Sequence, residues 1–173
     1  MIRDRLQFAR QKSWEDGIEF TMSGTKLKDR LKQVKRVRDF MTVDPMTVGP
    51  RDSLRKVVEL LRRRDIRSVA VVEEGIPIGI VTDRDVRQVA PGYPLFRDED
   101  EIRRYTENLT VTAAMTADPM TIGANAPLVE AAKILEIYRI SSLPVVDEHK
   151  LVGILSVVDL LRAFIEQNEE GAA

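Results

Sequence analysis

The stretch Met-Thr-Val-Asp-Pro-Met-Thr-Val-Gly at residues 41–49 decides the fold, because it returns as Met-Thr-Ala-Asp-Pro-Met-Thr-Ile-Gly at residues 115–123. Carried forward without a gap, the same offset matches identical residues through both copies: Leu54 with Leu128, Leu61 with Leu135, Ser68 with Ser142, Gly79 with Gly153, and Asp85 with Asp159. An open solenoid needs at least three such repeats. Two copies therefore predict a pseudo-symmetric pair packed face to face.

Each copy carries the signals of the same elements in the same order. An Asp-Pro pair, which disfavours helix at the aspartate, precedes a short extended segment at 46–48 or 120–122. A helix follows, with its start set by the alignment of Ser53 with Pro127 and with Asp52 as the expected cap. Its apolar residues recur at the spacing of a core-facing stripe: Leu54, Val57, Val58 and Leu61 in the first copy, and Leu128, Ala131, Ala132 and Leu135 in the second.

Two apolar runs follow the helix in each copy and are predicted to pair as a hairpin. They cover residues 69–72 and 76–81 in the first copy, and 143–146 and 151–155 in the second. A final helix is expected directly after each second run. The sequence therefore predicts the α/β class, with mixed α+β sheets, as two tandem β-α-β-β-α repeats packed as a pseudo-twofold pair.

The composition removes several classes of function. The chain has 173 residues, no cysteine and a single histidine, which leaves little room for a catalytic domain and no thiolate zinc site. That histidine, His149, lies in an expected hairpin turn and is predicted to be exposed and without a catalytic role. A formal net charge of -1 gives no overall attraction to nucleic acid or to an anionic membrane. Because the apolar runs are too short to span a bilayer and the start lacks a signal peptide, a cytoplasmic location is expected.

The junction of the last strand and the last helix carries the same motif in both copies. Residues 79–85 and 153–159 both contain Gly, two apolar residues, Ser or Thr, two variable residues, and Asp. One interpretation is a capping box, in which the hydroxyl and the carboxylate satisfy backbone N–H groups at the helix start. The other is a ligand site, in which the glycine lets a ligand approach the backbone while Asp85 and Asp159 bind the hydroxyls of a ribose. Because the motif occurs in both copies after matching strands, the sequence favours a ligand site in addition to a cap.

The chain resembles the CBS-domain pair, named after cystathionine β-synthase, over residues 37–165. The resemblance rests on the Met-Thr-x-Asp-Pro opening of each copy, the Ile-Ser-Ser-Leu-Pro-Val-Val-Asp stretch at 140–147, and the motif at 79–85. It implies two clefts that bind AMP, ADP, ATP, S-adenosylmethionine or a similar adenosine compound as a ligand, with no cofactor required. It also implies homodimers of such pairs, in a regulatory module that acts on a protein partner or on its own oligomer and catalyses nothing.

The resemblance also assigns ligand-binding residues. Thr82 and Asp85 are expected to hold ribose and phosphate in one cleft, with Ser156 and Asp159 in the same role in the other. The residues expected to line the adenine are Thr47, Val48, Thr121 and Ile122. Those expected to close the base pocket are Arg67, Ser68 and Val69 in the first copy, and Ser141, Ser142, Leu143 and Pro144 in the second.

The two clefts are predicted to be unequal. The first motif has Asp83 and Arg84 where the second has two valines (157–158), so that within the motif only Arg84 offers a partner for a phosphate. The first cleft is therefore expected to take a phosphorylated ligand, and the second a less charged ligand or none. The first copy also has Ala70 at the position of Pro144, a departure from the family that affects the expected adenine pocket of the first copy.

The remaining segments are assigned from local pattern. After Pro91 the connector shows helical spacing, which predicts a short helix that bridges the pair or, as an alternative, a lid over a cleft. The segment before the first repeat is strongly basic and is predicted to be helical. The predicted organisation is a basic extension at 1–36, the first repeat at 37–89, the connector at 90–110, the second repeat at 111–166 and a disordered tail at 167–173.

The sequence leaves three functions open. The leading hypothesis is a regulatory module whose clefts bind an adenosine-containing ligand. The second is a constitutive dimerisation scaffold that binds no ligand. The third is a nucleic-acid-binding regulator that uses the basic segment 26–38, and an enzyme ranks last.

Overall fold

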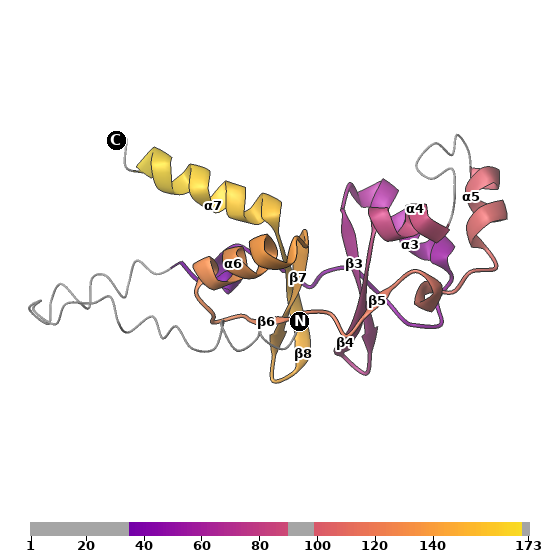
Figure 1. Cartoon of the computed structure of the whole chain (residues 1–173), viewed down its shortest axis with the longest axis horizontal. Coiled ribbons are helices and arrows are strands. Elements are labelled where there is room, and N and C mark those ends of the chain that lie inside the picture. Colours follow the sequence, from indigo (N-terminus) through magenta and orange to yellow (C-terminus); the bar gives the residue numbers. More distant parts are fainter. Residues whose placement is uncertain (1–34, 90–98, 171–173) are drawn as a thin grey trace, which may run out of the picture. The chain divides into compact units, whose positions relative to one another are not determined.

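The computed structural model describes residues 35–89 and 99–170, so the expectations for the basic extension before Lys35 and for the start of the connector lie outside the described residues (Figure 1). The first repeat contains β1 (Thr42–Val43), β2 (Thr47–Val48), α3 (Leu54–Arg64), β3 (Ser68–Glu73), β4 (Ile76–Thr82) and α4 (Asp83–Val89). The second contains β5 (Thr116–Ala117), β6 (Ile122–Gly123), α6 (Leu128–Tyr138), β7 (Ser142–Asp147), β8 (Lys150–Ser156) and α7 (Val157–Glu170). Each repeat begins with a short 3-10 helix, η2 (Val37–Asp39) or η3 (Val111–Ala113), and α5 (Glu99–Thr106) lies between the two repeats. The predicted class and the duplicated β-α-β-β-α order are confirmed.

Each sheet contains one strand from the other repeat. The strand orders are β2-β3-β4-β5 and β1-β8-β7-β6, so β5 of the second repeat completes the first sheet and β1 of the first repeat completes the second. Both added strands are antiparallel to their neighbours, with Ala117 opposite Gly79 and Val43 opposite Gly153. Two independent β-α-β-β-α units would have left β4 and β8 as edges, which the exchange covers.

The exchange extends from the sheets into the two hydrophobic cores. Val37, at the start of the first repeat, is fully buried in the core of the second repeat, and Val111 is fully buried in the core of the first. Backbone hydrogen bonds hold both segments, because the Val37 N–H donates to the Ala126 carbonyl at 3.0 Å and the Val111 N–H donates to the Asp52 carbonyl at 2.9 Å. Burial of each valine contributes about 1.5–3 kcal/mol. Neither core is therefore complete without residues of the other repeat.

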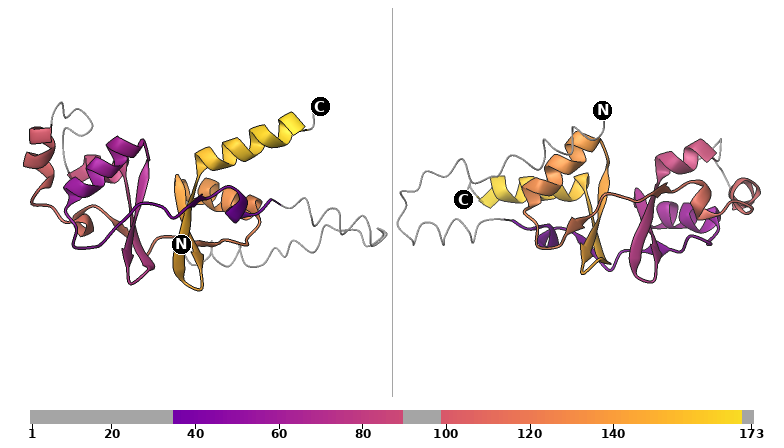
Figure 2. Two further views of the ribbon diagram at one scale, coloured as in Figure 1. Left: turned by 180° about the vertical axis from the view of Figure 1, so that it is seen from behind. Right: turned by 60° about the horizontal axis from the view of Figure 1, so that its bottom comes forward.

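The predicted helical stripes form the helix side of each core. All four predicted residues of α3 are buried, and in α6 Leu128, Ala131 and Leu135 are buried while Ala132 is half-buried. Helices α3 and α4 lie against β3 and β4, and α6 and α7 lie against β7 and β8 (Figures 1 and 2). The two sheets contact each other through β4 and β8. This arrangement confirms the predicted packing of two copies across their sheets.

The helix starts differ from the expectation that Asp52 caps α3. Ser53 is the residue before the first turn, and the carboxylate of Asp52 instead accepts the Gly49 N–H at 2.8 Å and pairs with Lys56 at 2.7 Å. The hydrogen bond from Lys56, followed by that from the Gly49 N–H, holds the pKa of Asp52 below its usual value. Ser53 forms no side-chain cap, and the first helical N–H of α3, at Leu54, donates instead to the Leu109 carbonyl at 2.7 Å.

Helix α6 begins in the same way as α3. Pro127 precedes its first turn rather than opening it, and the Leu128 N–H donates to the Lys35 carbonyl at 2.9 Å. The segment that enters each repeat therefore supplies the acceptor for the helix of the other repeat.

Two segments end or pack differently from their predictions. The sequence predicts that the connector helix bridges both repeats, but α5 packs on α3 of the first repeat. The reason is that Leu109, just after α5, is hydrogen-bonded to Leu54 and packs against the first core. Helix α7 continues to Glu170, into the segment predicted as a disordered tail, because no helix breaker occurs between its start and Gly171.

Two glycines allow the exchanged strands to approach. A Cβ atom on Gly153 would lie 2.6 Å from the Met41 sulfur and 2.9 Å from the backbone carbonyl of Thr42. A Cβ atom on Gly79 would lie 2.7 Å from the Met115 sulfur but 3.3 Å from the nearest backbone oxygen. These are the glycines of the repeated motif, for which the sequence predicts the approach of a ligand. The structure shows that they admit the other repeat.

We predict that Gly153→Ala destabilises the protein by about 1–3 kcal/mol, because the new methyl group collides with a backbone atom that cannot rotate away. Urea unfolding followed by circular dichroism measures the effect as a lower midpoint. Gly123→Ala is the matched control, since nothing lies within 4 Å of a Cβ atom at that strand position. Equal midpoints for the two variants would contradict the proposed role of Gly153.

Candidate functional site

Two clefts of similar size lie at corresponding places in the two repeats. Cleft 1 has a volume of about 490 Å³ and contains the strand-to-helix junction of the first repeat, at Thr82. Cleft 2 has a volume of about 480 Å³ and contains the equivalent junction of the second repeat, at Ser156. Both volumes fit a small-molecule ligand.

Each cleft is built crosswise from both repeats. Cleft 1 combines the junction at Thr82 with the Asp-Pro-Met segment 118–120 of the second repeat. Cleft 2 combines the junction at Ser156 with the Asp-Pro-Met segment 44–46 of the first repeat. The cause is the strand exchange, because β5 pairs antiparallel with β4 and brings segment 118–120 beside the first repeat, where the Asp118 N–H donates to the Ile78 carbonyl at 3.2 Å. Strand β1 pairs with β8 in the same way and brings segment 44–46 beside the second repeat.

Asp44 and Asp118 are cleft residues that were not predicted from the sequence. Both have left-handed backbone conformations, with φ of 47° and 49°, and both line a cleft. Positive φ is unfavourable for most residues but is tolerated by aspartate. The signal available in the sequence was the Asp-Pro pair repeated in both copies, followed each time by a methionine.

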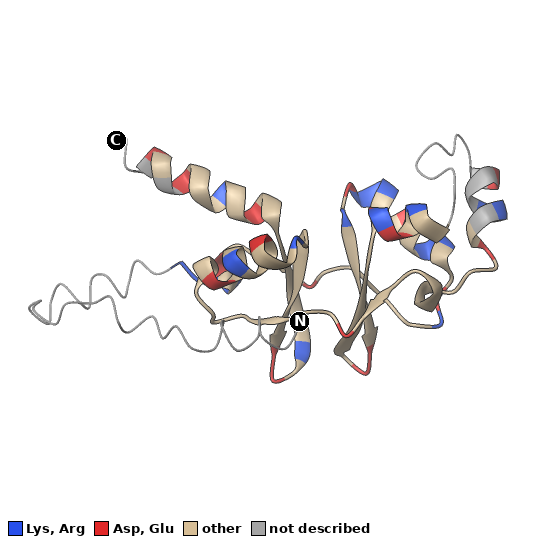
Figure 3. Ribbon diagram, viewed as in Figure 1, with Lys and Arg blue, Asp and Glu red and all other residues tan. Residues whose placement is uncertain are grey.

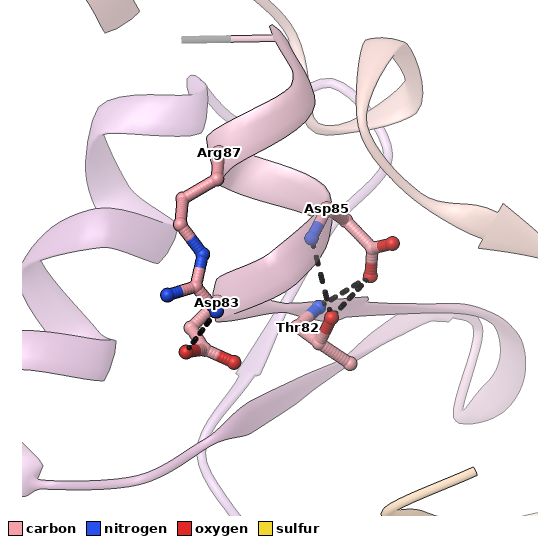
Figure 4. Close-up of polar contacts among 4 residues, drawn as sticks. All are labelled: Thr82, Asp83, Asp85 and Arg87. Atoms are coloured by element: carbon pink, nitrogen blue, oxygen red, sulfur yellow. Dashed lines mark hydrogen bonds and ion pairs between the residues drawn. The ribbon is translucent and has the colours of Figure 1, made fainter. Parts of the chain in front are cut away.

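The capping box at Thr82 and Asp85 is formed as the first interpretation predicted (Figure 4). Oδ2 of Asp85 accepts the Thr82 N–H at 2.8 Å and the Thr82 hydroxyl at 2.6 Å. In return, the Asp85 N–H donates to Oγ1 of Thr82 at 3.3 Å. The aspartate therefore holds the first turn of α4 with one oxygen, while its other oxygen has no hydrogen bond within the described part of the chain and Asp85 lines cleft 1.

The equivalent aspartate of the second repeat is more fully occupied. Oδ2 of Asp159 accepts the N–H and the hydroxyl of Ser156 at 2.8 and 2.6 Å. Its Oδ1 accepts a hydrogen bond from Arg162 at 3.2 Å, and the residue is only 6% exposed. Asp159 does not line cleft 2, whereas Asp85 lines cleft 1. The two motifs therefore form the same helix cap, but only the first has its aspartate in a cleft.

The clefts also differ in charge. Cleft 1 contains four arginines and three aspartates: Arg67, Arg84, Arg87, Arg139, Asp83, Asp85 and Asp118. Arg87 is paired with Asp83 at 2.9 Å (Figure 4), which leaves the guanidinium groups of Arg67, Arg84 and Arg139 without an ion pair to a described residue. Cleft 2 contains Arg64, Arg67 and Asp44 among apolar residues such as Met46 and Val158. Cleft 1 is thus better suited to a phosphate, because guanidinium groups bind phosphate oxygens in a bidentate manner.

The structure brings nine of the sequence-assigned residues to the clefts. These are Arg67, Ser68, Thr82, Arg84, Asp85, Ser141, Ser142, Pro144 and Ser156. The seven that do not line a cleft are Thr47, Val48, Val69, Thr121, Ile122, Leu143 and Asp159. Four of these are apolar side chains buried in the two cores, because β2, β3, β6 and β7 turn them toward the helices.

The position of Pro144 follows from the crosswise construction. Pro144 lines cleft 1, together with Thr82 of the other repeat. The proline typical of the family therefore belongs to cleft 1, whereas Ala70, which is fully buried, corresponds to cleft 2. Ala70 itself lines neither cleft, and its expected effect on the adenine pocket of the first copy stays a prediction.

The described residues offer no other chemical centre. No group of three or more His, Cys, Asp or Glu side chains within residues 35–89 and 99–170 is placed to hold a metal ion. His149 is exposed in the turn between β7 and β8, as expected. Of the helices in the described part of the chain, none has the length and apolar character needed to cross a bilayer.

Comparison with known proteins matches the repeats seen in the structure. The family model of the CBS domain matches residues 37–92 and again residues 111–166. The inosine-5'-monophosphate dehydrogenase of Korarchaeum cryptofilum is 34% identical over 145 residues. That match covers 81% of this chain but only 27% of the dehydrogenase.

Solved structures of similar fold contain adenosine compounds. CBSX2 of Arabidopsis thaliana, crystallised in complex with AMP, is 26% identical with a TM-score of 0.63, and the match covers 77% of this chain and 98% of CBSX2. The CBS domain pair of protein MJ0100, in complex with 5'-methylthioadenosine and S-adenosyl-L-methionine, is 25% identical with a TM-score of 0.62. That match covers 75% of this chain and 99% of the MJ0100 domain pair.

We predict that Thr82→Ala lowers the stability of the ligand-free protein by about 0.5–2 kcal/mol, because it removes the hydroxyl that links both ends of the capping box. Thr82→Ser keeps that hydroxyl and is expected to stay within about 0.5 kcal/mol of the parent. Chemical denaturation of the two variants gives the comparison. If Thr82→Ala and Thr82→Ser were equally stable, the capping role of Thr82 would be wrong.

Proposed function

Because the chain belongs to the CBS-domain family, we propose that it is a regulatory module that binds an adenosine-containing ligand, with cleft 1 as the site for a phosphorylated one. The observation that carries the proposal is that Asp85, with one carboxylate oxygen unengaged, lines the same cleft as three arginines that have no ion pair to a described residue. The complexes of CBSX2 with AMP and of the MJ0100 pair with S-adenosyl-L-methionine support the ligand class.

In cleft 1 each group of the ligand has a chemical partner. The free oxygen of Asp85 accepts hydrogen bonds from the ribose hydroxyls, and the hydroxyl of Thr82 lies beside it. Arg84 and Arg139 bind the phosphate, which suits AMP, ADP or ATP. Pro144 and Met120 give the adenine an apolar surface. No cofactor is required for this binding.

In cleft 2 the partners favour a less charged compound. Val157 and Val158 replace the charged residues of the first motif, and Met46 and Ile66 add apolar surface. Asp159 is buried behind Ser156 and paired with Arg162, so its carboxylate is less available to a ribose. S-adenosylmethionine or another adenosine compound without phosphate fits this cleft better than a nucleotide does.

Regulation follows from the crosswise construction of the clefts. A ligand in either cleft contacts segments of both repeats, so it changes the relative stability of their arrangements. A ligand shifts such an equilibrium only through unequal affinity for the two states. We propose that this shift alters a protein partner or the oligomer, as in energy sensing by adenine nucleotides, and that the chain acts in the cytoplasm without catalysis.

The nucleic-acid alternative loses support at the described end of the basic segment. Lys35 donates to the Ala163 carbonyl at 3.2 Å, and Arg36 donates to the Asn125 carbonyl at 2.6 Å. Arg38 donates to the Asn125 side chain at 2.8 Å. These three cations hold the exchanged segment on the second repeat. The main alternative is a dimerisation scaffold that binds no ligand. A measurement of ligand binding distinguishes it from the proposed regulatory module.

The exposed face of α7 supports the homodimer. Leu161 and Phe164 are 57% and 64% exposed, and Val158 and Ile165 lie on the same exposed side. The equivalent helix α4 has Arg84 and Arg87 at the positions of Val158 and Leu161, and Figure 3 shows basic residues on α3 and α4 where α7 carries mostly uncharged ones. Contact of α7 with α4 of a second copy would bury the guanidinium group of Arg84, which has no ion pair to a described residue, and this costs free energy. We therefore propose an isologous dimer in which α7 contacts α7 of the second copy.

We predict that AMP, ADP or ATP at one hundred times its dissociation constant raises the melting temperature by about 5–10 °C. The panel also contains S-adenosylmethionine and NAD, and each variant is compared with its own ligand-free form. Arg84→Ala, at an exposed position, is expected to reduce the shift given by the nucleotides while leaving the shift given by S-adenosylmethionine unchanged. Differential scanning fluorimetry measures all of these shifts.

Asp85→Ala and Asp159→Ala test the two clefts in the same panel. Both remove a cap, so both lower the ligand-free melting temperature, but Asp85→Ala alone is expected to abolish the nucleotide-induced shift. A panel in which no compound shifts the parent protein would favour the scaffold. Nucleotide shifts that survive both substitutions would contradict the ribose assignment.

We predict that Leu161→Glu converts the dimer to a monomer, because a carboxylate cannot be buried at the centre of an apolar contact without a partner. Size-exclusion chromatography with light scattering measures the mass. Gln88→Glu, at an exposed position of α4, is the matched control and is expected to leave the mass unchanged. A Leu161→Glu variant that stays dimeric would rule out the α7 contact.

A further inference from the structure

Corresponding serines of the two repeats meet between the two clefts. The Ser142 hydroxyl donates to the Ser68 hydroxyl at 2.8 Å, and these residues occupy the same position in the two copies. Both serines are buried, and Ser142 lines both clefts. The pseudo-twofold relation of the repeats therefore passes through this hydrogen bond, and residues beside it face both clefts.

Arg67 is the charged residue at this boundary. It lines both cleft 1 and cleft 2, and its side chain is exposed. Arg67 lies just before β3, and its backbone is hydrogen-bonded to the start of α4, because its carbonyl accepts the Asp83 N–H at 3.2 Å. Within residues 35–89 and 99–170, its guanidinium has no ion pair or hydrogen bond, so it is available to a ligand.

The second repeat has no equivalent charge. The position that corresponds to Arg67 is Ser141, whose carbonyl accepts the Val157 N–H at 3.0 Å in the same backbone arrangement. Ser141 also lines both clefts, but its side chain is short and neutral. The two clefts therefore share one guanidinium, where an exact duplication would have supplied two.

We propose that the two clefts compete for Arg67, so that a phosphorylated ligand in one cleft lowers the affinity of the other for a second phosphorylated ligand. This inference rests on the proposed ligand class. When the guanidinium of Arg67 binds the phosphate in one cleft, its N–H donors and its charge are used by that phosphate. A phosphate in the other cleft must then bind without Arg67. Couplings of this kind amount to about 5- to 150-fold in affinity.

The competition has a preferred order. Cleft 1 has Arg84 and Arg139 in addition to Arg67, whereas cleft 2 has Arg64 in addition to Arg67. Cleft 1 therefore binds a nucleotide first and engages Arg67. Cleft 2, which depends more on Arg67, then binds its ligand without that guanidinium. An uncharged adenosine ligand makes no use of a guanidinium, so it fills the two clefts without this coupling.

The test is calorimetric titration of the full chain with AMP, and with adenosine as the uncharged control. Met120→Trp fills cleft 1, since Met120 is 36% exposed there, and is expected to leave one site. That site, cleft 2, is expected to bind AMP about tenfold more tightly than the second step of the parent, because Arg67 is no longer taken. Met46→Trp, the equivalent substitution in cleft 2, is the matched control and should leave the first step unchanged.

Ser141→Arg supplies the missing guanidinium and is expected to tighten the second AMP step about tenfold, with no change for adenosine. Ser141→Gln, of similar length but neutral, should not do so. Two affinities are compared with the second AMP step of the parent: that of cleft 2 in Met120→Trp and that of the second step in Ser141→Arg. If both equal the parent value, the sharing of Arg67 is overturned and the proposed function is left intact. A parent protein that binds neither AMP nor adenosine would contradict the proposed function itself.

Discussion

The pairing of β5 with β4 and of β1 with β8 is the interaction on which the rest of this structure depends. It joins backbone to backbone across the two repeats, and it is possible because Gly79 and Gly153 leave space for Met115 and Met41. The same segments bring Val37 and Val111 into the opposite cores and supply the acceptors for the first N–H groups of α3 and α6. Because each repeat lacks part of its own core, the pair is expected to fold as one cooperative unit.

The strand exchange also creates the clefts. Each exchanged strand ends in an Asp-Pro-Met segment that stands opposite a strand-to-helix junction of the other repeat. In the first repeat, the aspartate of that junction holds the helix cap with one oxygen and also lines the cleft. A ligand bound there uses a side chain whose orientation is already fixed, so little conformational entropy is lost on binding.

The positions at which the two copies differ include residues that line the clefts and residues on the exposed sides of α4 and α7. Arg84 against Val158 gives cleft 1 a charge where cleft 2 has an apolar side chain, and Arg67 against Ser141 leaves one guanidinium that lines both clefts. Leu161 against Arg87 gives α7 an exposed apolar residue where α4 has a charged one. The duplicated backbone therefore provides the sites, and a few side-chain differences make them unequal.

The sequence by itself determined the duplication, the buried stripes of α3 and α6, the two hairpins, and the capping pairs at Thr82 and Ser156. All of these are local, since periodicity and short-range hydrogen bonds are encoded within a few residues. The tertiary structure alone decided which strand completes which sheet, that Pro144 lies in the cleft of Thr82, and that Asp159 is buried while Asp85 faces a cleft. It also placed α5 on α3. These features depend on pairing between segments far apart in the chain. Two repeats with the same strand pattern are compatible with pairing within a copy as well as with pairing between copies.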